Sequence, residues 1–394
     1  MPTPVRRPRL VVLSPFLDKR HGTERCVAEQ IERLAGVYEI HLYSSRVEEV
    51  DLSGITWHKV PALPGPHLFG YIWWLCANRI QRWRDAKFRG IAPDVVYSPG
   101  VNCLDADVVS VHVLFSKVRE QIARSRDRAT SWPVILHRRI YYRLIESLEA
   151  KVYGREDIFL AAVSKKTAQD IRARFGPKKH LSVIYHGVDC AKFNPQRRMN
   201  LRVAARNALG LPEDSFAVLF IGNDWRNRGL RCLLEAVSIL RDRKVHVLVV
   251  GTDSTAGYKE TVENLGLTGR VQFLPPRGDV EFYYAAADAY AGPSLEDTFS
   301  LPPAEAMACG LPVITTRATG VSEIIHHGED GLVLEDPTDA KTLSEWLARL
   351  AIDDNWRNQL GNAAAQTAAR HTWDQNSAQL QQVIEQLIKS KTKT

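Results

Sequence analysis

Short apolar runs alternate with amphipathic stretches over the first half of the chain. Runs of aliphatic and β-branched residues predict buried strands, and apolar residues at three- and four-residue spacing predict helices. The predicted strands of this half are residues 9–16, 38–43, 55–60, 94–98, 108–112, 158–164 and 181–187. Helices are predicted at 23–34 and 165–176. Because alternating strands and helices form parallel sheets covered on both faces, this half predicts a doubly wound α/β domain.

The second half repeats this alternation. Its predicted strands are residues 216–221, 245–250, 271–274, 289–291, 313–315 and 331–334. Its predicted helices are residues 229–241, 280–287, 303–309, 339–350 and 356–371. We therefore expect a second doubly wound, Rossmann-like domain, with the two domains facing one cleft and ligands at the carboxyl ends of the strands.

Two further segments set the expected domain boundaries. Residues 188–201 lose the periodicity and carry turn residues, so the boundary is predicted close to Pro195. A helix at 373–388 has an apolar stripe but follows the second sheet, so we expect it to pack back on the first domain. The predicted domains are residues 1–195 together with 373–394, and residues 196–372.

The composition is that of a soluble globular protein. The 394 residues are too many for one ordinary core, and 45% are hydrophobic and 25% charged. Six scattered cysteines without metal-ligand spacing indicate thiols in a reducing compartment. No run of 18 apolar residues occurs, and the N-terminal apolar run is too short for a signal peptide. The net charge of +7 leaves nucleic acid, an anionic membrane or a phosphorylated substrate open as partners.

Residues 297–310 read DTFSLPPAEAMACG and combine two carboxylates with a helix start. Backbone N–H groups and the positive end of a helix dipole converge at such a start, which suits a phosphate. The carboxylates of Asp297 and Glu305 only accept hydrogen bonds, which suits the hydroxyls of a sugar or ribose. This stretch therefore predicts a site for a nucleotide-sugar.

Other candidate residues lie at predicted strand ends. The dinucleotide fingerprint and the P-loop are absent, which disfavours dehydrogenase and NTPase functions. Arg226 and Arg228 lie in the turn before Gly229, where guanidinium groups can clamp a diphosphate, although loop arginines are more often simply solvated. Gly22 precedes the first helix and His112 ends a strand, and either is also compatible with a purely structural role.

Residues 67–90 interleave aromatic side chains with basic ones, and residues 124–143 do so again. The basic residues of the first stretch are Arg79, Arg82, Arg84, Lys87 and Arg89. This composition suits a helix lying on an anionic membrane, and equally an amphipathic core helix with a solvated basic face. No single-strand-binding or helix-turn-helix pattern accompanies it, so we expect no nucleic acid partner.

Together these residues resemble a retaining glycosyltransferase of the GT-B fold, in the large family 4, over nearly the whole chain. The family pattern is Glu, seven residues, Glu, with Phe-Gly-Leu shortly after the first acid. Here Asp297 takes the first position and Ser300 that of the glycine. The resemblance implies that Asp297 holds hydroxyls of the donor sugar and Glu305 the ribose. It also implies that backbone N–H groups of Phe299, Ser300 and Leu301 meet sugar or phosphate.

The resemblance extends to four other positions. The family usually carries an arginine and then a lysine on the diphosphate, and here Asn223 and Arg228 occupy these positions. The resemblance implies that Arg228 binds the diphosphate in place of the family's lysine. It also implies that Arg226 replaces the arginine that is absent at position 223. Gly22 matches a glycine whose backbone approaches the donor phosphate, and His112 matches a strand-end position that often faces the transferred sugar.

The implied reaction moves a hexose from a nucleoside-diphosphate-sugar to a hydroxyl of a glycan or lipid-linked acceptor. The first domain would bind the acceptor and the second the donor, with Asp297 and His112 as the catalytic residues. No cofactor and no metal is expected, because the only Asp-x-Asp, Asp105 with Asp107, precedes a strand instead of ending one. Residues 222–229 and 105–112 are most similar to the lipopolysaccharide core glucosyltransferase branch, which implies cell-envelope synthesis. The enzyme would be cytoplasmic, or peripheral on the inner face of the cytoplasmic membrane.

Two other functions remain open. A nucleotide-sugar epimerase or a phosphorylase can share this two-domain fold, and product analysis distinguishes an epimerase because it changes the donor without an acceptor. A non-enzymatic basic protein that binds membrane or nucleic acid would not depend on Asp297 or Glu305.

Overall fold

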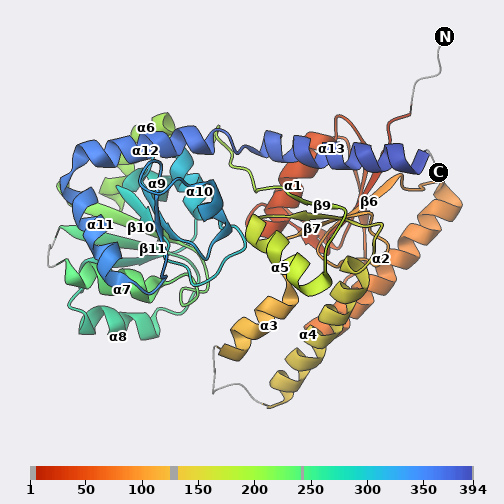
Figure 1. Ribbon diagram of the computed structural model, residues 1–394, viewed down its shortest axis with the longest axis horizontal. Coiled ribbons are helices and arrows are strands. Elements are labelled where there is room, and N and C mark those ends of the chain that lie inside the picture. The colour runs from red at the N-terminus through yellow and green to blue at the C-terminus, as the bar shows by residue number, and fades with distance from the viewer. Residues whose placement is uncertain (1–5, 125–131, 241–243, 393–394) are drawn as a thin grey trace, which may run out of the picture. The chain divides into compact units, whose positions relative to one another are not determined.

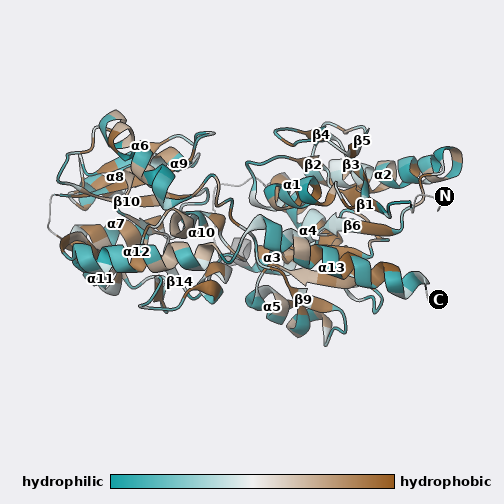
Figure 2. Ribbon diagram, turned by 90° about the horizontal axis from the view of Figure 1, so that it is seen from above, coloured by the Kyte–Doolittle hydropathy of each residue, from teal (hydrophilic) through white to brown (hydrophobic). Residues whose placement is uncertain are grey.

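The computed structural model describes residues 6–124, 132–240 and 244–392, and it divides into two compact units (Figure 1). Unit 1 comprises Met1–Tyr185 with Trp373–Thr394, and unit 2 comprises His186–Thr372. Each unit has its own parallel sheet with helices packed against it. The strands of both sheets are mostly hydrophobic in colour, whereas the helices carry both colours (Figure 2). This architecture confirms the predicted fold class of two doubly wound α/β domains.

Unit 1 is built on a seven-stranded parallel sheet with the order β5-β3-β1-β6-β7-β8-β9. Its strands are β1 (Arg9–Leu13), β3 (Glu39–Ser44), β5 (Ile55–Lys59), β6 (Val95–Pro99), β7 (Val108–Val111), β8 (Phe159–Ala162) and β9 (Leu181–Val183). A second small sheet pairs β2 (Phe16–Leu17) with β4 (Arg46–Val47). Because the chain first builds outward from β1 to β5 and then returns to β6, the strand order reverses between β1 and β6.

Alternate residues of these strands enter two hydrophobic clusters. Leu10 and Val12 belong to one cluster, and Val11 and Leu13 to the other, as the two-residue period of a strand requires. The helices of the unit are α1 (Gly22–Leu34), α2 (His67–Arg89), α3 (Phe115–Arg124), α4 (Trp132–Tyr153), α5 (Lys165–Phe175) and α13 (Trp373–Thr392). The continuous apolar runs of the strands thus reflect burial on both faces.

The C-terminal helix α13 packs on unit 1, as predicted. Its residues Leu380, Val383 and Ile384 lie in the same hydrophobic cluster as Val27 and Ile31 of α1. Figure 1 shows the blue α13 beside the red α1. The chain therefore returns to its first unit after completing the second.

Unit 2 has a six-stranded parallel sheet with the order β12-β11-β10-β13-β14-β15. Its strands are β10 (Phe216–Ile221), β11 (Val245–Val250), β12 (Val271–Leu274), β13 (Ala289–Ala291), β14 (Val313–Thr316) and β15 (Leu332–Leu334). Its helices are α6 (Pro195–Ala208), α7 (Leu230–Ile239), α8 (Ala256–Asn264), α9 (Glu281–Ala286), α10 (Leu301–Ala308), the 3-10 helix η1 (Gly320–Ile324), α11 (Ala340–Ile352) and α12 (Asp354–Ala368). The strand order reverses between β10 and β13, and a ligand site is expected at this switch point.

The boundary between the units lies before the predicted position near Pro195. Residues 186–194 belong to unit 2, where Val188 N donates to His371 O at 2.9 Å and Phe193 packs edge-on against Tyr284. Pro195 begins the helix α6, whose N-terminus is capped by Asn194. The turn residues that predicted a domain boundary therefore include Asn194, the N-cap of a helix.

Candidate functional site

The candidate donor site lies at the carboxyl ends of β10 and β13, the neighbouring strands at the switch point of unit 2. The segment after β10 runs from Gly222 to Gly229, and the segment after β13 leads through Asp297 into α10. Parallel strands place their carboxyl ends at one edge of the sheet, which brings these two segments together. The sequence predicted both segments as parts of one site.

Arg228 joins the two segments. Its Nη1 donates to Asp297 Oδ2, and to Ser300 Oγ at 3.1 Å. Gly222 lies directly beneath this side chain, since a Cβ there would be in van der Waals contact with Arg228 Nε at 3.4 Å. The result is a cation held beside a carboxylate at the end of the central strands.

Asn227, which no sequence pattern indicated, also joins the two segments. Its Nδ2 donates to Glu296 O at 2.8 Å, and its carbonyl accepts from Leu295 N at 2.7 Å. These bonds fix the turn that carries Arg228 against the loop that carries Asp297. An asparagine between two arginines gives no distinctive signal in a sequence, so only the fold identifies its role.

The backbone of Asp297 is held by the segment between β14 and η1. Asp297 N donates to Ala318 O at 3.2 Å, and Gly320 N donates to Asp297 O at 3.1 Å. Phe299 N approaches Asp297 Oδ1 at 3.4 Å, and the Phe299 ring is buried against His186 at a centroid distance of 5.0 Å. The backbone that carries the carboxylate is therefore held by hydrogen bonds to a neighbouring segment of unit 2.

Ser300 adopts a backbone conformation that favours glycine. Its φ is +79° and its ψ 105°, at the residue that precedes the first turn of α10, where Leu301 begins the helix. A non-glycine residue with positive φ stores roughly 1–3 kcal/mol of strain. The structure thus accounts for the glycine of the family pattern at this position, and Ser300 adds a hydroxyl that bonds to Arg228.

We expect the free energy of unfolding of Ser300→Gly to exceed that of Ser300→Ala by about 1 kcal/mol. Both variants lose the hydroxyl, but only glycine relieves the positive φ. Denaturant unfolding of the two variants measures the difference. Ser238 of the helix α7 is the control position. There Ser238→Ala should be more stable than Ser238→Gly, because alanine has the higher helix propensity. Equal stabilities at position 300 would contradict a strained Ser300.

Glu305 lies in α10, one turn beyond the loop, and is buried. Its Oε2 accepts a hydrogen bond from Tyr284 Oη of α9 at 2.8 Å. Burial, together with the neighbouring Glu305 carboxylate, raises the pKa of Tyr284 well above its usual range, so this phenol stays a donor. Tyr284 was not predicted, because its contact depends on how α9 packs beside α10.

Two other residues predicted to bind the donor, Asn223 and Arg226, lie on the turn after β10. Asn223 Oδ1 accepts from the N and Oγ1 of Thr252, both at 3.0 Å, and so ties the ends of β10 and β11 together. Arg226 is exposed to solvent. Within the part of the chain that the structure describes, neither Asn223 nor Arg226 forms a hydrogen bond or ion pair with Asp297 or Ser300.

In unit 1, Gly22 begins α1 after a tightly held turn. Asp18 Oδ1 accepts from Arg20 N at 2.8 Å and from His21 N at 2.9 Å. Burial of Asp18 is outweighed by these hydrogen bonds, which lower the pKa of its carboxyl. Gly22 is exposed at the helix N-terminus, where N–H groups have no acceptor inside the helix.

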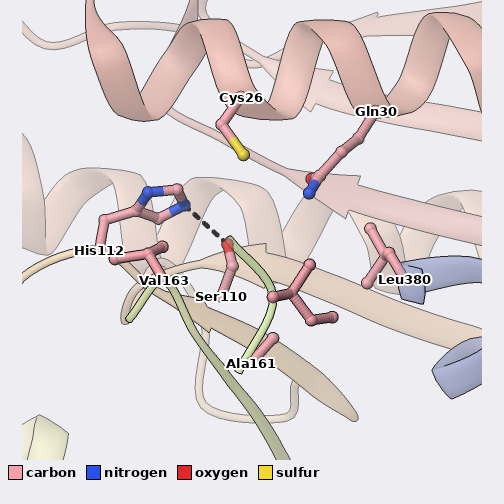
Figure 3. Close-up of a pocket in the computed structure, with 8 residues that line it drawn as sticks. Cys26, Gln30, Ser110, His112, Ala161, Val163 and Leu380 are labelled. Carbon is pink, nitrogen blue, oxygen red and sulfur yellow. Dashed lines mark hydrogen bonds between the residues drawn. The ribbon is translucent and has the colours of Figure 1, made fainter. Parts of the chain in front are cut away.

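His112 follows β7 at its carboxyl end and lines a small cavity with Cys26, Gln30 and Ser110 (Figure 3). Its Nε2 lies 3.0 Å from Ser110 Oγ. Burial lowers the pKa of His112 to about 4, so the imidazole is neutral near pH 7. Since Cys26 lies one turn after Gly22 on α1, both predicted residues of unit 1 lie at the same end of its sheet.

The two carboxylates of the Asp-x-Asp sequence bind basic side chains of unit 1. Asp105 accepts two hydrogen bonds from Arg82, at 2.8 and 2.9 Å. Asp107 Oδ1 lies 2.7 Å from Lys391 Nζ, and its Oδ2 accepts from Val96 N at 2.8 Å. Both aspartates therefore stabilise the fold of unit 1.

Comparison with protein families matches both halves of the chain. Residues 20–192 match the model described as Glycosyltransferase Family 4, and residues 202–367 match the model described as Glycosyl transferases group 1. The D-inositol 3-phosphate glycosyltransferase of Corynebacterium urealyticum is 31% identical over 251 residues, or 61% of this chain and 59% of that relative. The enzyme of the same name from Thermobifida fusca is 32% identical over 233 residues, or 55% and 52%. The matched region thus spans less than two thirds of these relatives.

Solved structures share the fold at low sequence identity. WaaG, a glycosyltransferase involved in lipopolysaccharide biosynthesis, has a TM-score of 0.78 at 19% identity, over 95% of this chain and 99% of that one. Sucrose-phosphate synthase from Thermosynechococcus elongatus has a TM-score of 0.78 at 20% identity, over 98% and 100%. HepE of Anabaena, in complex with UDP and glucose, has a TM-score of 0.72 at 18% identity, over 95% and 99%.

Proposed function

Because the chain belongs to the family 4 glycosyltransferases of the GT-B fold, we propose that it transfers a hexose from a nucleoside-diphosphate-sugar to an acceptor hydroxyl, with retention at the anomeric carbon. The observation that carries the proposal is the contact of Arg228 with Asp297 and Ser300 at the switch point of unit 2, beside the buried Glu305. A cation, two carboxylates and a helix start are the groups that a diphosphate and two sets of hydroxyls require.

Each donor-site residue has a distinct role in the proposed complex. Glu305 accepts hydrogen bonds from the ribose, and Asp297 from hydroxyls of the hexose. Arg228 binds the diphosphate, together with the N–H groups of Phe299, Ser300 and Leu301. One solved structure of the same fold, HepE, is a complex with UDP and glucose, which supports a nucleoside-diphosphate-sugar as the proposed donor.

In the proposed reaction the acceptor oxygen forms a bond to the anomeric carbon as the bond from that carbon to the diphosphate oxygen breaks. The acceptor proton passes to an oxygen of the leaving diphosphate. Negative charge develops on this diphosphate, and Arg228 and the helix start of α10 stabilise it. The buried, neutral His112 of unit 1 is proposed to face the transferred sugar.

Thermal-shift measurements with UDP-, GDP- and ADP-sugars test the donor site. A ligand at a hundred times its Kd stabilises the folded protein by about 2.7 kcal/mol, so one nucleotide should raise Tm by several degrees. Glu305→Gln should abolish this shift. Glu281→Gln is the matched control, since this buried glutamate binds Arg197 and Lys192 elsewhere in unit 2. A shift that survives in Glu305→Gln would contradict the ribose role.

Product analysis then tests the reaction. The proposed enzyme forms a glycosylated acceptor and a free nucleoside diphosphate. An epimerase would convert the donor without an acceptor, and this outcome would replace our proposal.

We further propose that the acceptor is a glycan or lipid-linked molecule of the cell envelope and that the protein acts on the cytoplasmic face of an anionic membrane. The support is a surface on α2 and α4, here called the α2–α4 surface. Its exposed apolar members are Phe69, Ile72, Trp73, Ile80, Trp83, Phe88, Val134, Ile135, Leu136 and Ile140. Its exposed basic members are Arg79, Arg84, Lys87, Arg89, Arg138, Arg139 and Arg143.

The two helices are neighbours, since Tyr141 of α4 packs against Tyr71 of α2 at 6.0 Å. Phe69, Trp73, Ile80 and Trp83 recur at three, four and seven residues, so they lie on one face of α2, and Trp83 is 57% exposed. Large exposed apolar side chains with basic neighbours are typical of helices that lie in a membrane interface. Arg82, a basic residue of the same helix, does not belong to this surface, because its side chain donates to Asp105. Residues 125–131 of the second basic stretch lie outside the described residues.

No helix within the described residues is long and apolar enough to cross a bilayer. We expect the chain to co-sediment with vesicles that contain an anionic phospholipid and less with purely zwitterionic ones. Replacing Arg84 and Lys87 with Gln should weaken this binding roughly thirtyfold, because each basic residue near the surface contributes about 1 kcal/mol.

The control variant removes the same charge elsewhere in unit 1. Arg172 of α5 and Lys389 of α13 are exposed, and their replacement with Gln should leave vesicle binding nearly unchanged. If both double variants lost binding equally, the attraction would depend on net charge and the proposed surface would be wrong.

A further inference from the structure

A chain of buried hydrogen bonds connects the C-terminal helix to His112 within unit 1. Its members come from α13, α1, β6 and β7, and none is more than 6% exposed. In order they are Asn376, Gln30, Tyr97, Ser110 and His112. Figure 3 shows Gln30, Ser110 and His112 around the cavity, with the bond between Ser110 and His112 dashed.

The direction of the chain is set at its far end. Asn376 Nδ2 donates to the backbone carbonyl of Tyr185 at 2.6 Å, and a carbonyl can only accept. Asn376 must therefore turn its Oδ1 toward Gln30, which donates from Nε2 at 2.8 Å. This contact in turn orients the Gln30 amide, whose Oε1 lies toward Tyr97.

The hydroxyl groups transmit this direction to the histidine. Tyr97 Oη lies 2.6 Å from Gln30 Oε1, an oxygen without a proton, and so must donate its single proton there. In its 2.9 Å contact with Ser110 Oγ, Tyr97 Oη can then only accept, and the serine hydroxyl donates. Because the proton of Ser110 is used, its oxygen accepts from His112 Nε2 at 3.0 Å.

We propose that this chain holds His112 in the tautomer with its proton on Nε2 and its lone pair on Nδ1, and that Asn376 of α13 is the positioning residue that selects it. In a neutral imidazole one nitrogen donates and the other accepts, and the group bound to one nitrogen decides the state of the other. Of the five residues in this hydrogen-bond series, only His112 has to touch a substrate for this effect.

The consequence for transfer rests on the proposed function. With its lone pair on Nδ1, His112 accepts a hydrogen bond that a hydroxyl of the sugar donates. The opposite tautomer would present an N–H to the same hydroxyl and misorient it. Burial lowers the pKa of His112 to about 4, which keeps the ring neutral and makes the choice of tautomer matter near pH 7.

The tautomer is measured directly from the imidazole nitrogen shifts of the full-length protein labelled with ¹⁵N-histidine, and the signal of His112 is assigned by its loss in His112→Gln. We expect the Nε2–H form in the wild type. Tyr97→Phe removes the acceptor of the Ser110 proton, so Ser110 can donate to Nε2 and a large fraction of His112 should change to the Nδ1–H form. Tyr38→Phe is the matched control, since among the described residues the buried Tyr38 hydroxyl has no hydrogen-bond partner.

A second pair of variants tests Asn376 itself. Asn376→Asp still accepts from Gln30, so it should keep the wild-type tautomer even if it costs stability. Asn376→Ala frees the Gln30 amide to turn over, so both tautomers should appear. A purely structural role would lower Tm in both variants and change the tautomer in neither.

Activity gives a separate readout. Tyr97→Phe should lower kcat for transfer about tenfold, with KM for the donor changed less than threefold, and Tyr38→Phe should change neither appreciably. An Nδ1–H wild type, or an unchanged tautomer in folded Tyr97→Phe or folded Asn376→Ala, would overturn the proposal. A protein that shows the expected tautomers but transfers no sugar would instead refute the proposed function.

Discussion

Arg228→Met is expected to lower kcat/KM for glycosyl transfer about a thousandfold. Methionine keeps much of the length of the side chain but removes its charge and its donors. In the proposed reaction this guanidinium stabilises the charge on the leaving diphosphate, and arginines in that position contribute roughly 10³ or more to phosphoryl-transfer rates. Steady-state kinetics with the nucleotide-sugar identified by thermal shift measures the loss.

Three further variants make this measurement specific. Arg317→Met removes another arginine of unit 2, exposed and paired with Glu335, and should change kcat/KM less than twofold. Because Arg228 contacts Asp297, Asp297→Asn should also be strongly impaired, and the double variant should lose much less than the product of the two single losses. Full activity in Arg228→Met would show that the diphosphate is bound elsewhere.

Gly229→Ala is expected to destabilise unit 2 by about 4 kcal/mol. Gly229 has a φ of +79°, and an added Cβ would lie 1.9 Å from Pro293 O. Positive φ costs a non-glycine residue roughly 1–3 kcal/mol, and forcing backbone apart adds a similar amount. Since Pro293 lies in the segment that leads to Asp297, the same displacement should also weaken nucleotide binding. Thermal unfolding measures the first effect, and the ligand-induced shift in Tm the second.

Gly210→Ala separates the two causes. Gly210 also has a positive φ, of +61°, but no atom lies within 4 Å of its added Cβ. This variant should lose only the conformational part, about 1 kcal/mol, and should bind nucleotide normally. If both variants melted alike, the close approach of Pro293 would not be the reason for a glycine at position 229.

Periodicity predicted the sheets well because buried parallel strands are continuous apolar runs. The predicted bounds of β10, β12 and β13 agree with the structure to the residue. Periodicity did not predict α6, which packs through polar contacts on the two residues that follow α9. Arg198, Arg202 and Arg206 recur every four residues, and the first two donate to Ala287 O while the last two bind the buried Asp288. A helix that packs through arginines carries no apolar stripe.

The candidate donor site was predictable to the extent that strand ends meet at one edge of a sheet. This rule brought Arg228 and Asp297 together from segments far apart in the chain. It could not identify Tyr284 or Asn227, because their contacts depend on how helices and turns pack beside the strands. Nor could it connect Gln30 with Asn376, which meet only because α13 returns to α1.

The return of the chain to unit 1 has a consequence for how donor specificity can change. Unit 2 is one uninterrupted segment, and its two ends are fastened to each other where Val188 pairs with Thr372 in a parallel bridge. A segment whose ends are adjacent behaves as a cassette. Recombination at these two joints would exchange Arg228, Asp297, Ser300 and Glu305 together, while leaving the sheet of unit 1 and its terminal helix covalently unaltered. The proposed contacts of unit 2 with the donor would thus be exchanged as one segment.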